Sequence, residues 1–287
     1  MRRLAVLGHP VAHSRSPAMQ NAALAALGLG EEWTYEAIDV APEEFEARVR
    51  ALPAEGFAGA NVTVPHKLAA LALADTASEM AREIGAANTL VFTAGGIQAD
   101  NTDAGGLIAS LPESPRGQRA LVLGAGGAAR AAVWALGAAG ASVEIWNRTA
   151  ARAETVSVEV TARAEELQVE IEVRAIEIEV QESPAVELDQ SGYGLIVNTT
   201  AVGLHGEDPF EHLPLRQDGF GPGQVVVDMV YGDRPSTLLR AAAAAGATVV
   251  DGIEVLVQQG ALSLRLWTER EPPVEVMRAA AYSLGDS

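Results

Sequence analysis

Apolar positions along this chain come in short runs that alternate with longer amphipathic or alanine-rich stretches. The short runs include LAVLG at 4–8, GANVTV at 59–64 and ALVLG at 120–124. Apolar runs of about four to eight residues bounded by turn residues predict buried strands, and the stretches between them predict helices. Strand and helix therefore alternate from the first residues onward, which is typical of parallel sheets covered by helices on both faces.

Turn and capping residues give the expected limits of these elements. Ser16 followed by Pro17 predicts a helix start with Ser16 as the N-cap, and Gly28 suits the position just past its end. Pro65 ends the strand before it, and Gly95-Gly96 joins two strands into a hairpin. We expect strands over 4–8, 33–40, 59–64, 88–92, 96–101, 119–124, 141–149, 194–203 and 224–232. We expect helices over 16–28, 42–52, between 66 and 84, after the glycine-rich turn to 140, and between 252 and 285, with a helix and a strand between 236 and 252.

The segment 155–180 departs from this pattern, because Val or Ile alternates with Glu over much of its length. Alternation with a period of two favours a strand, whereas its place in the strand–helix series favours a helix first. Residues 150–190 hold 11 acidic and 3 basic residues. We interpret the segment as an exposed acidic flank, with a helix followed by an edge strand, and not as a binding site.

Composition and charge limit the kinds of partner. With 287 residues, 48% hydrophobic and 20% charged, the chain is globular, with one large domain or two of ordinary size. Its formal net charge is 20 − 38 = −18, so it lacks the basic face that nucleic acids or anionic membranes require. We expect a small-molecule ligand, with any anion site built locally from Arg side chains, hydroxyls and backbone N–H groups.

Cysteine is absent, which excludes disulfides and thiolate chemistry and is consistent with a cytoplasmic protein. The first apolar run is broken at Gly8-His9-Pro10, so it is too short for a signal-peptide core, and no apolar run is long enough to span a membrane. Pro10 lies between His9 and His13, which argues against a helical metal pair, and no metal is expected.

A glycine-rich turn indicates nucleotide binding. It fits G-x-G-x-x-A, follows an apolar strand and opens a long helix, and this context makes the motif far more specific than a lone match. The first glycine allows the tight turn, the second lets the backbone approach a pyrophosphate, and the small last residue lets helix and strand pack closely. The free N–H groups of the helix start then face the phosphates. The residues concerned are Gly124, Ala125, Gly126, Gly127, Ala128 and Ala129.

The end of the next strand favours NADP(H) over NAD(H). An NAD site usually has an acidic residue there to accept a hydrogen bond from the ribose 2′-hydroxyl, but this strand ends in Asn147, Arg148 and Thr149. The Arg148 guanidinium can bind a 2′-phosphate through paired hydrogen bonds and can stack on adenine. Thr149 can donate to the same phosphate, and Arg152 is either a further ligand or a surface charge.

A second candidate site lies near the start of the chain. Ser14 and Ser16 stand at a helix start, where two hydroxyls beside free N–H groups could hold a carboxylate. From the residues alone, the structural reading is favoured, in which Ser16 caps the helix and Ser14 belongs to the loop.

A set of motifs in fixed order resembles the shikimate dehydrogenase family along nearly the whole chain. The motifs are GHPVAHSRSP, NVTVPHK, GAANT, NTDAGG, GAGGAAR, NRT and DGIEVLVQQ. The resemblance implies NADP-dependent interconversion of 3-dehydroshikimate and shikimate, a step of chorismate and aromatic amino acid biosynthesis, by a monomer or homodimer. It also implies a two-domain α/β fold. Residues 1–103 with 252–287 would form the substrate domain, to which the C-terminal helix returns, and 104–251 a doubly wound Rossmann NADP domain.

The resemblance also assigns roles residue by residue. Ser14 and Ser16 would hold the substrate carboxylate, and Lys67 and Asp103 would form the catalytic pair. Tyr231 would lie near both nicotinamide and substrate, and Gly203 in the loop beside the nicotinamide. The ring hydroxyls would be bound by Thr63, Lys67, Asn88, Asp103 and Gln259. Two departures are Gln20, where many relatives have His, and Leu204, where Met is common; Leu204 weakens the predicted nicotinamide contact.

Lys67 is the only lysine, since the other 19 of the 20 basic residues are Arg. Reducing a ketone requires a proton on oxygen as well as a hydride on carbon, and Lys can exchange that proton whereas Arg cannot. His66 is an alternative proton carrier that we expect to point elsewhere. Two other functions remain open: a quinate or dual quinate/shikimate dehydrogenase, and a non-catalytic NADP-binding regulator.

Overall fold

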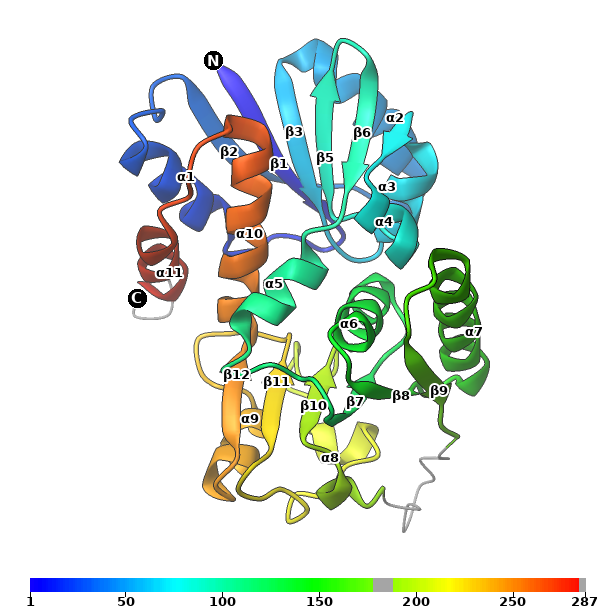
Figure 1. Ribbon diagram of the computed structural model, residues 1–287. Coiled ribbons are helices and arrows are strands. Elements are labelled where there is room, and N and C mark those ends of the chain that lie inside the picture. The colour runs from blue at the N-terminus through cyan, green and yellow to red at the C-terminus, as the bar shows by residue number, and fades with distance from the viewer. Residues whose placement is uncertain (178–187, 284–287) are drawn as a thin grey trace. The chain divides into compact units, whose positions relative to one another are not determined.

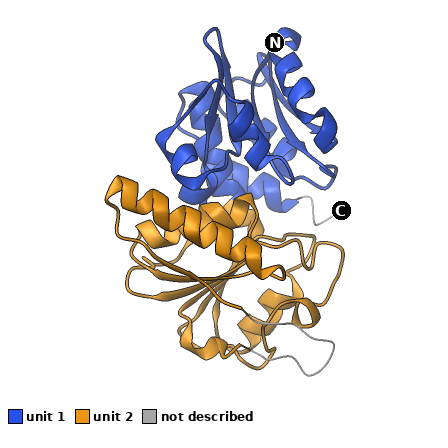
Figure 2. Cartoon of the chain, turned by 90° about the vertical axis from the view of Figure 1, so that its right-hand side faces the viewer, with its two compact units in different colours: residues 1–106, 256–287 blue, residues 107–255 orange. Residues whose placement is uncertain are grey.

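The computed structural model describes residues 1–177 and 188–283. The chain divides into two compact units, which Figure 2 shows in different colours. Residues 1–106 and 256–287 belong to the first unit, and residues 107–255 to the second. This agrees with the predicted two-domain α/β class. The functional assignment of the predicted domains, and their boundaries at 103 and 252, stay predictions.

A six-stranded sheet forms the centre of the first unit (Figure 1). Its strands are β1 (Arg2–Gly8), β2 (Trp33–Asp39), β3 (Phe57–Val62), β4 (Thr76–Ala77), β5 (Thr89–Thr93) and β6 (Gly96–Asp100). They lie in the order β2-β1-β3-β5-β6-β4, with β1 parallel to β2 and β3 and with β5 antiparallel to β3 and β6. The predicted hairpin is confirmed, and it makes this sheet mixed where alternation alone indicated a parallel one.

Helices cover both faces of this sheet, because side chains of successive strand residues point to opposite faces. They are α1 (Ser16–Ala26), α2 (Phe45–Ala51), α3 (Lys67–Leu73), α4 (Glu79–Ile84) and α11 (Val274–Ser283), with parts of α5 (Asp103–Ser110) and α10 (Gly252–Thr268) and two 3₁₀ turns, Pro42–Glu44 and Leu52–Glu55. Residues of α2 and α3 form one core cluster with Ala5 and Leu7 of β1. On the other face, the Trp267 ring of α10 contacts the Tyr35 ring of β2, and Arg15 Nη1 beside α1 donates to the Ala281 carbonyl of α11 at 2.8 Å.

The predicted cap of α1 is wrong by one residue. Arg15 occupies the N-cap, with φ −85° and ψ −5°, and makes no side-chain capping bond, while Ser16 is already helical. The cause lies upstream, where the Ser14 hydroxyl accepts a hydrogen bond from the Ser16 N–H at 3.3 Å. A side-chain oxygen two residues earlier therefore satisfies this donor, which frees the Ser16 hydroxyl from capping.

A parallel six-stranded sheet forms the second unit. Its strands are β7 (Arg119–Leu123), β8 (Ser142–Trp146), β9 (Glu172–Ala175), β10 (Leu195–Asn198), β11 (Val225–Asp228) and β12 (Thr248–Asp251). They lie in the order β12-β11-β10-β7-β8-β9, so the chain turns back at the pair β7–β10. This is the doubly wound order of dinucleotide-binding domains, in which ligands bind at the carboxyl ends of the strands beside the point of reversal.

The helices of this unit follow the predicted series and are α6 (Gly127–Ala138), α7 (Ala150–Leu167), α8 (Pro209–His212) and α9 (Thr237–Ala244). The interpretation of 155–180 as a helix followed by an edge strand is confirmed for its described residues, and 178–180 lie outside them. Helix α7 buries Ala153, Val156, Val160 and Ala164, which recur at helical spacing, whereas Val158 is exposed. The spacing of the buried residues, and not the local alternation with Glu, therefore decided the structure.

Across residues 1–177 and 188–283, we find no helix both long enough and apolar enough to cross a membrane.

Candidate active site

A largely buried ion pair joins Lys67 and Asp103 in the first unit. Lys67 is the first residue of α3 and Asp103 the first residue of α5. Lys67 Nζ donates to Asp103 Oδ2 at 2.6 Å, and each side chain is 12% exposed. This places a proton donor and a carboxylate in direct contact at a site that is largely shielded from water.

Local structure before and after Asp103 holds this carboxylate in place. The Asn101 side-chain oxygen accepts hydrogen bonds from the N–H groups of Asp103 at 3.0 Å and Ala104 at 3.4 Å, so Asn101 caps α5. Further along α5, an added Cβ on Gly106 would lie 2.5 Å from the Cβ of Gln259. The helix start is therefore fixed, and the missing side chain lets α10 approach it.

Asn88 connects the ion pair to Gln259. The Asn88 Nδ2 group donates to Asp103 Oδ1 at 2.8 Å and lies 3.1 Å from Gln259 Oε1. Both amide side chains are buried. Lys67, Asp103, Asn88 and Gln259 thus form one continuous hydrogen-bonded group, assembled from α3, α5, the start of β5 and α10.

The other predicted substrate residues of this unit lie at the carboxyl ends of β1 and β3. Ser14 is half-buried and Ser16 buried, and the Ser16 N–H donates to the Ser14 hydroxyl as described above. Thr63 is half-buried, and its N–H donates to the Leu7 carbonyl at 2.8 Å. Its methyl group lies 2.4 Å from the position of an added Cβ on Gly8, so glycine is needed where these two segments cross.

His66 faces away from the lysine, as expected. Its ring stacks on Phe45 with centroids 4.2 Å apart, and its Nε2 donates to the Val40 carbonyl at 2.7 Å. Burial lowers the pKa of His66, and the Val40 bond only partly offsets this. These contacts direct the His66 ring to Phe45 and Val40, and not to the ion pair.

The glycine-rich turn lies at the carboxyl end of β7, beside the point where the sheet reverses. Gly124 has φ +115°, and an added Cβ there would lie 2.5 Å from Thr199 Oγ1 in the loop after β10. In contrast, an added Cβ on Gly126 would meet no atom, so the space above the turn is open. Ala129 is fully buried beneath it. The tight turn and the close helix–strand packing expected of the motif are present, and the pyrophosphate contact stays a prediction.

The end of β8 presents an available cation. Arg148 and Thr149 are exposed, and among the residues that the structure describes Arg148 has no hydrogen-bond or ion-pair partner. Asn147 donates through Nδ2 to the Thr149 carbonyl at 3.0 Å, which closes the turn. Arg152 is also exposed on the first turn of α7. The guanidinium of Arg148 is therefore available to an anionic ligand, and no carboxylate occupies the strand end.

Gly203 and Tyr231 follow β10 and β11. Gly203 has φ +100°, and its N–H, like that of His205, donates to the Glu207 carboxylate at 3.0 Å. Tyr231 is half-buried just past Asp228, whose carboxylate accepts from Asn198 Nδ2 at 2.9 Å and from Ser236 Oγ at 2.6 Å. Burial raises the pKa of Asp228 despite these bonds.

Sequence reasoning did not find several buried polar residues behind Asn88. Thr102 donates its N–H to Asn88 Oδ1 at 2.7 Å, and Thr89 donates its hydroxyl to the same oxygen at 3.1 Å. Ser263 lies one helical turn beyond Gln259 and hydrogen bonds with both threonines. The spacing from Gln259 was the only available signal for Ser263, because residues four apart share a helix face.

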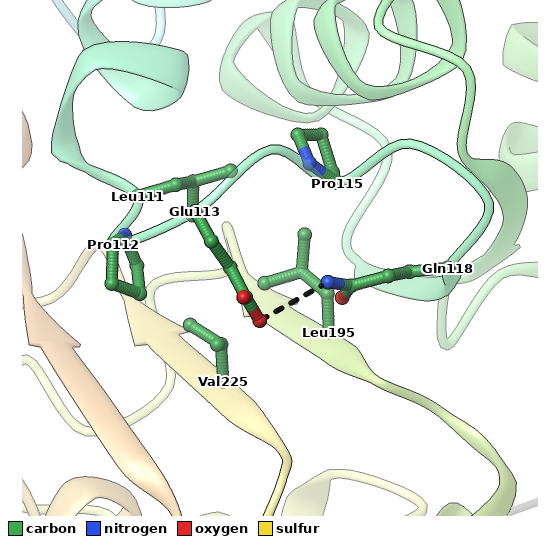
Figure 3. A pocket seen from close by; sticks show the side chains of 7 residues that line it. All are labelled: Leu111, Pro112, Glu113, Pro115, Gln118, Leu195 and Val225. Atoms are coloured by element: carbon green, nitrogen blue, oxygen red, sulfur yellow. Dashed lines mark hydrogen bonds between the residues drawn. The ribbon is translucent and has the colours of Figure 1, made fainter.

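One small pocket lies away from these groups, at the amino ends of β10 and β11 (Figure 3). Gln118 Nε2 donates to Glu113 Oε1 across it at 3.4 Å. Its lining residues are Leu111, Pro112, Glu113, Pro115, Gln118, Leu195 and Val225. Ligands of doubly wound sheets bind at the opposite, carboxyl edge, so this pocket is not part of the candidate site.

The second unit has the strand order of dinucleotide-binding domains, and the first unit is a separate α/β unit that holds the ion pair. The chain therefore belongs to the class of two-domain, dinucleotide-binding α/β proteins. Comparison with known families is more specific. The model of the shikimate dehydrogenase substrate-binding domain matches residues 6–90, and that of the shikimate 5′-dehydrogenase C-terminal domain matches residues 252–282. The chain belongs to the shikimate dehydrogenase family.

Individual relatives agree with this assignment. The chain is 46% identical over 282 residues to a shikimate dehydrogenase (NADP(+)) of Anaeromyxobacter sp. strain Fw109-5, covering 98% of this chain and 95% of that one. Its fold matches shikimate 5-dehydrogenase of Thermus thermophilus in complex with NADP(H) and shikimate, with a TM-score of 0.80, 41% identity and 99% of each chain covered. It also matches 5-ketofructose reductase of Gluconobacter sp. strain CHM43, with a TM-score of 0.83, 31% identity and 98% of each chain covered.

Proposed function

We propose that this chain catalyses the reversible NADPH-dependent reduction of 3-dehydroshikimate to shikimate, a step of chorismate and aromatic amino acid biosynthesis. The observation that carries the proposal is the Lys67–Asp103 pair, buried and hydrogen bonded through Asn88 to Gln259 in a chain of this family. We further propose that the enzyme works in the cytoplasm as a monomer or homodimer.

The second unit suits NADP(H). The open space above Gly126 leaves room for a pyrophosphate against the backbone, and the twelve-residue helix α6 directs its free N–H groups toward it. Arg148, with Thr149, would bind the 2′-phosphate. Gly203 and Tyr231, at the ends of β10 and β11, would contact the nicotinamide. When bound, the reduced nicotinamide supplies the hydride that reaches the ketone carbon.

The ion pair supplies the proton. Lys67 as an ammonium donates a proton from Nζ to the ketone oxygen as the alcohol forms, and the neutral amine takes the proton back in the reverse direction. Asp103 holds Lys67 through Oδ2 and can accept a hydrogen bond from a neighbouring ring hydroxyl. Because both side chains are largely buried, this exchange occurs away from bulk water, where electrostatic interactions are stronger.

The remaining residues of the first unit would orient the substrate. Ser14 and Ser16 offer two hydroxyls for a carboxylate, and the Ser16 hydroxyl does not cap α1, whose N-cap is Arg15. Thr63, Asn88 and Gln259 would bind the ring hydroxyls. A substrate with one carboxylate and several hydroxyls fits this set of donors and acceptors.

The test is oxidation of NADPH by the purified protein in the presence of 3-dehydroshikimate. Parallel assays would use shikimate with NADP, quinate with NAD, and 5-ketofructose with NADPH. We expect shikimate with NADP to be turned over most efficiently. Higher kcat/KM for quinate with NAD would identify the chain as a quinate dehydrogenase. Tight NADPH binding without turnover of any substrate would favour a non-catalytic regulator.

A further inference from the structure

Three hydroxyl side chains from distant parts of the chain meet inside the first unit. Thr89 lies on β5, Thr102 precedes α5, and Ser263 lies on α10. Ser263 Oγ is 2.8 Å from Thr89 Oγ1 and 3.0 Å from Thr102 Oγ1. All three are buried, with exposures of 0%, 4% and 0% in chain order. Buried hydroxyls are costly unless they are hydrogen bonded, so a cluster of three requires an explanation. We call these residues the hydroxyl cluster.

Asn61 contacts the hydroxyl cluster from behind and is itself hydrogen bonded to Tyr35. Asn61 Nδ2 donates to Ser263 Oγ at 2.9 Å and lies 3.2 Å from Thr89 Oγ1. Asn61 Oδ1 is occupied by the Tyr35 hydroxyl, which donates to it at 2.7 Å. Asn61 thus supplies donors to the cluster from behind, while Ser263 shares a hydrogen bond with each threonine in which either hydroxyl can be the donor.

Acceptors on the other side of the cluster belong to Asn88 and Gln259. Thr89 donates to Asn88 Oδ1 at 3.1 Å, and Ser263 donates to the Gln259 carbonyl at 3.1 Å. Thr102 Oγ1 lies 3.2 Å from Asn88 Oδ1 and 3.4 Å from Gln259 Oε1, so its single proton can serve either. The oxygen end of the Asn88 amide is therefore saturated by donors from this side.

This saturation decides how Asn88 meets the ion pair. With its oxygen held by these donors, the amide directs its nitrogen to Asp103 Oδ1 at 2.8 Å, and the same nitrogen also donates to Thr102 Oγ1 at 2.9 Å. A flipped amide would place its oxygen against the Asp103 carboxylate and its nitrogen against the Thr102 N–H donor, and both contacts are unfavourable.

We infer that Thr89, Thr102 and Ser263 are positioning residues that fix the Asn88 amide, and through it Asp103 and Gln259, in the orientation required to bind the ring hydroxyls. The effect on turnover rests on the proposed function, whereas the effect on Asn88 does not. Loss of a cluster hydroxyl should therefore weaken the handling of 3-dehydroshikimate and leave that of NADPH unchanged.

The test compares Thr89→Val with Thr89→Ser. Valine keeps the branched shape and the strand preference but removes the hydroxyl, whereas serine keeps the hydroxyl. We expect Thr89→Val to lower kcat/KM for 3-dehydroshikimate about tenfold, with KM for NADPH unchanged. Thr89→Ser should retain most of the activity. Thr93→Val, on the same strand but in the exposed turn, is the control and should behave like the wild type.

A second measurement does not depend on catalysis. NMR exchange of the Asn88 side-chain amide protons with water should accelerate about tenfold in Thr89→Val and stay slow in Thr89→Ser. Unchanged amide exchange in Thr89→Val would overturn the inference. An equal rise of KM for 3-dehydroshikimate and for NADPH would also overturn it, as would equal effects of Thr89→Val and Thr89→Ser. A wild-type enzyme without turnover would overturn the proposed function alone, and the exchange measurement would then decide on the cluster.

Discussion

At the scale of single residues, the chemistry depends on Lys67 and cannot be transferred to another cation. Lys67→Arg keeps the charge beside Asp103 but cannot transfer a proton to or from the substrate oxygen, because a guanidinium is not deprotonated in proteins. We expect kcat to fall by about 10²–10⁴-fold in Lys67→Arg and in Lys67→Ala, since this is the usual contribution of a proton-transfer group.

The measurement for Lys67 is steady-state turnover together with NADPH affinity by fluorescence titration. NADPH binding should be unchanged, because its proposed ligands lie in the second unit. Asp103→Asn is the companion variant, which keeps the Asn88 contact and removes the carboxylate charge. Near-normal turnover by Lys67→Arg would contradict the catalytic assignment.

Arg148 is the residue on which cofactor choice should depend. It is exposed and has no partner in the described part of the chain, so its removal should cost no stability. We expect Arg148→Ala to raise KM for NADPH by about tenfold or more while leaving KM for NADH nearly unchanged, because only NADPH carries the 2′-phosphate.

Arg152→Ala serves as the matched control, since Arg152 is a second exposed arginine four residues further on, in the first turn of α7. A small effect there would identify Arg152 as a surface charge. Equal effects of Arg148→Ala on the two cofactors would contradict the proposed phosphate contact.

At the scale of elements, the contact of α5 with α10 depends on one of two adjacent glycines. An added Cβ on Gly106 would lie 2.5–2.8 Å from the Cβ, N and Cα of Gln259, whereas one on Gly105 would meet only the Leu262 methyl at 2.8 Å. A leucine methyl can move, but helix backbone cannot move without shifting Gln259 itself.

We therefore expect Gly106→Ala to lower the free energy of unfolding by about 1–3 kcal/mol through overpacking and to raise KM for the substrate. Gly105→Ala should be neutral or stabilising, because alanine is favoured over glycine within a helix. Chemical denaturation and substrate KM of the two variants give the comparison. Equal stability of the two would show that α10 yields more easily than its packing indicates.

The buried carboxylate of Glu144 on β8 connects this strand to its two neighbours in the sheet of the second unit. It accepts hydrogen bonds from Arg119 and Arg174 on the flanking strands and from the Tyr193 hydroxyl. Burial on its own raises the pKa of Glu144, but these three donors outweigh it and hold the pKa below its ordinary value of 4.5. Burial, together with the same contact to Glu144, raises the pKa of Tyr193.

The sign of the resulting pH dependence follows from linkage. A carboxyl whose pKa is lower in the folded state stabilises the fold above its unfolded pKa, and this contribution disappears as pH falls through the folded value. We expect Glu144→Gln to lower the free energy of unfolding at pH 7 by about 1–3 kcal/mol and to flatten its decline below about pH 4.5. Urea titrations across pH measure both effects. The control is Glu275→Gln, an exposed partner of Arg278, which should change little.

Element by element, local signals predicted the strands and helices well, and failures came from interactions that a local pattern does not contain. The prediction of Ser16 as the N-cap was wrong because Ser16 is already helical and its N–H is satisfied by the Ser14 hydroxyl. The hydroxyl cluster was missed for a similar reason, since Ser263 meets Thr89 across 174 positions of sequence. Pairings at that distance are set by how the strands and helices pack, not by spacing along the chain.

At the scale of the whole molecule, the fold class was predictable because the strand–helix series and the glycine-rich turn each indicate a doubly wound domain. The mixed pairing of the first sheet was not indicated by the alternation itself. It follows from the short hairpin of β5 and β6, which reverses the chain without a crossover helix. The motifs located Lys67 and Asp103, but their contact at 2.6 Å required the fold.

The net charge of −18 acts on the molecule as a whole. Mutual repulsion of like charges opposes the compact state, and dissolved salt screens it. We expect the melting temperature at pH 7 to rise as sodium chloride is added from low ionic strength. The rise should vanish near the isoelectric point of about 4.6, where little net charge remains to be screened. Calorimetric scans at the two pH values would show the difference, and a salt-independent melting temperature at pH 7 would contradict it.

Because the sequence has a single lysine, an amine-specific reagent can report on one position of the candidate site. Lys67 Nζ is the only lysine amine in this sequence, so among the side chains it is the one primary amine that an acylating reagent can modify. Because this amine is ion-paired and largely buried, acylation of Lys67 should be slow. Mass spectrometry of the modified chain would then count occupancy of the site directly, without any assay of turnover. Any bound molecule that covers Lys67 would register as a missing acyl group.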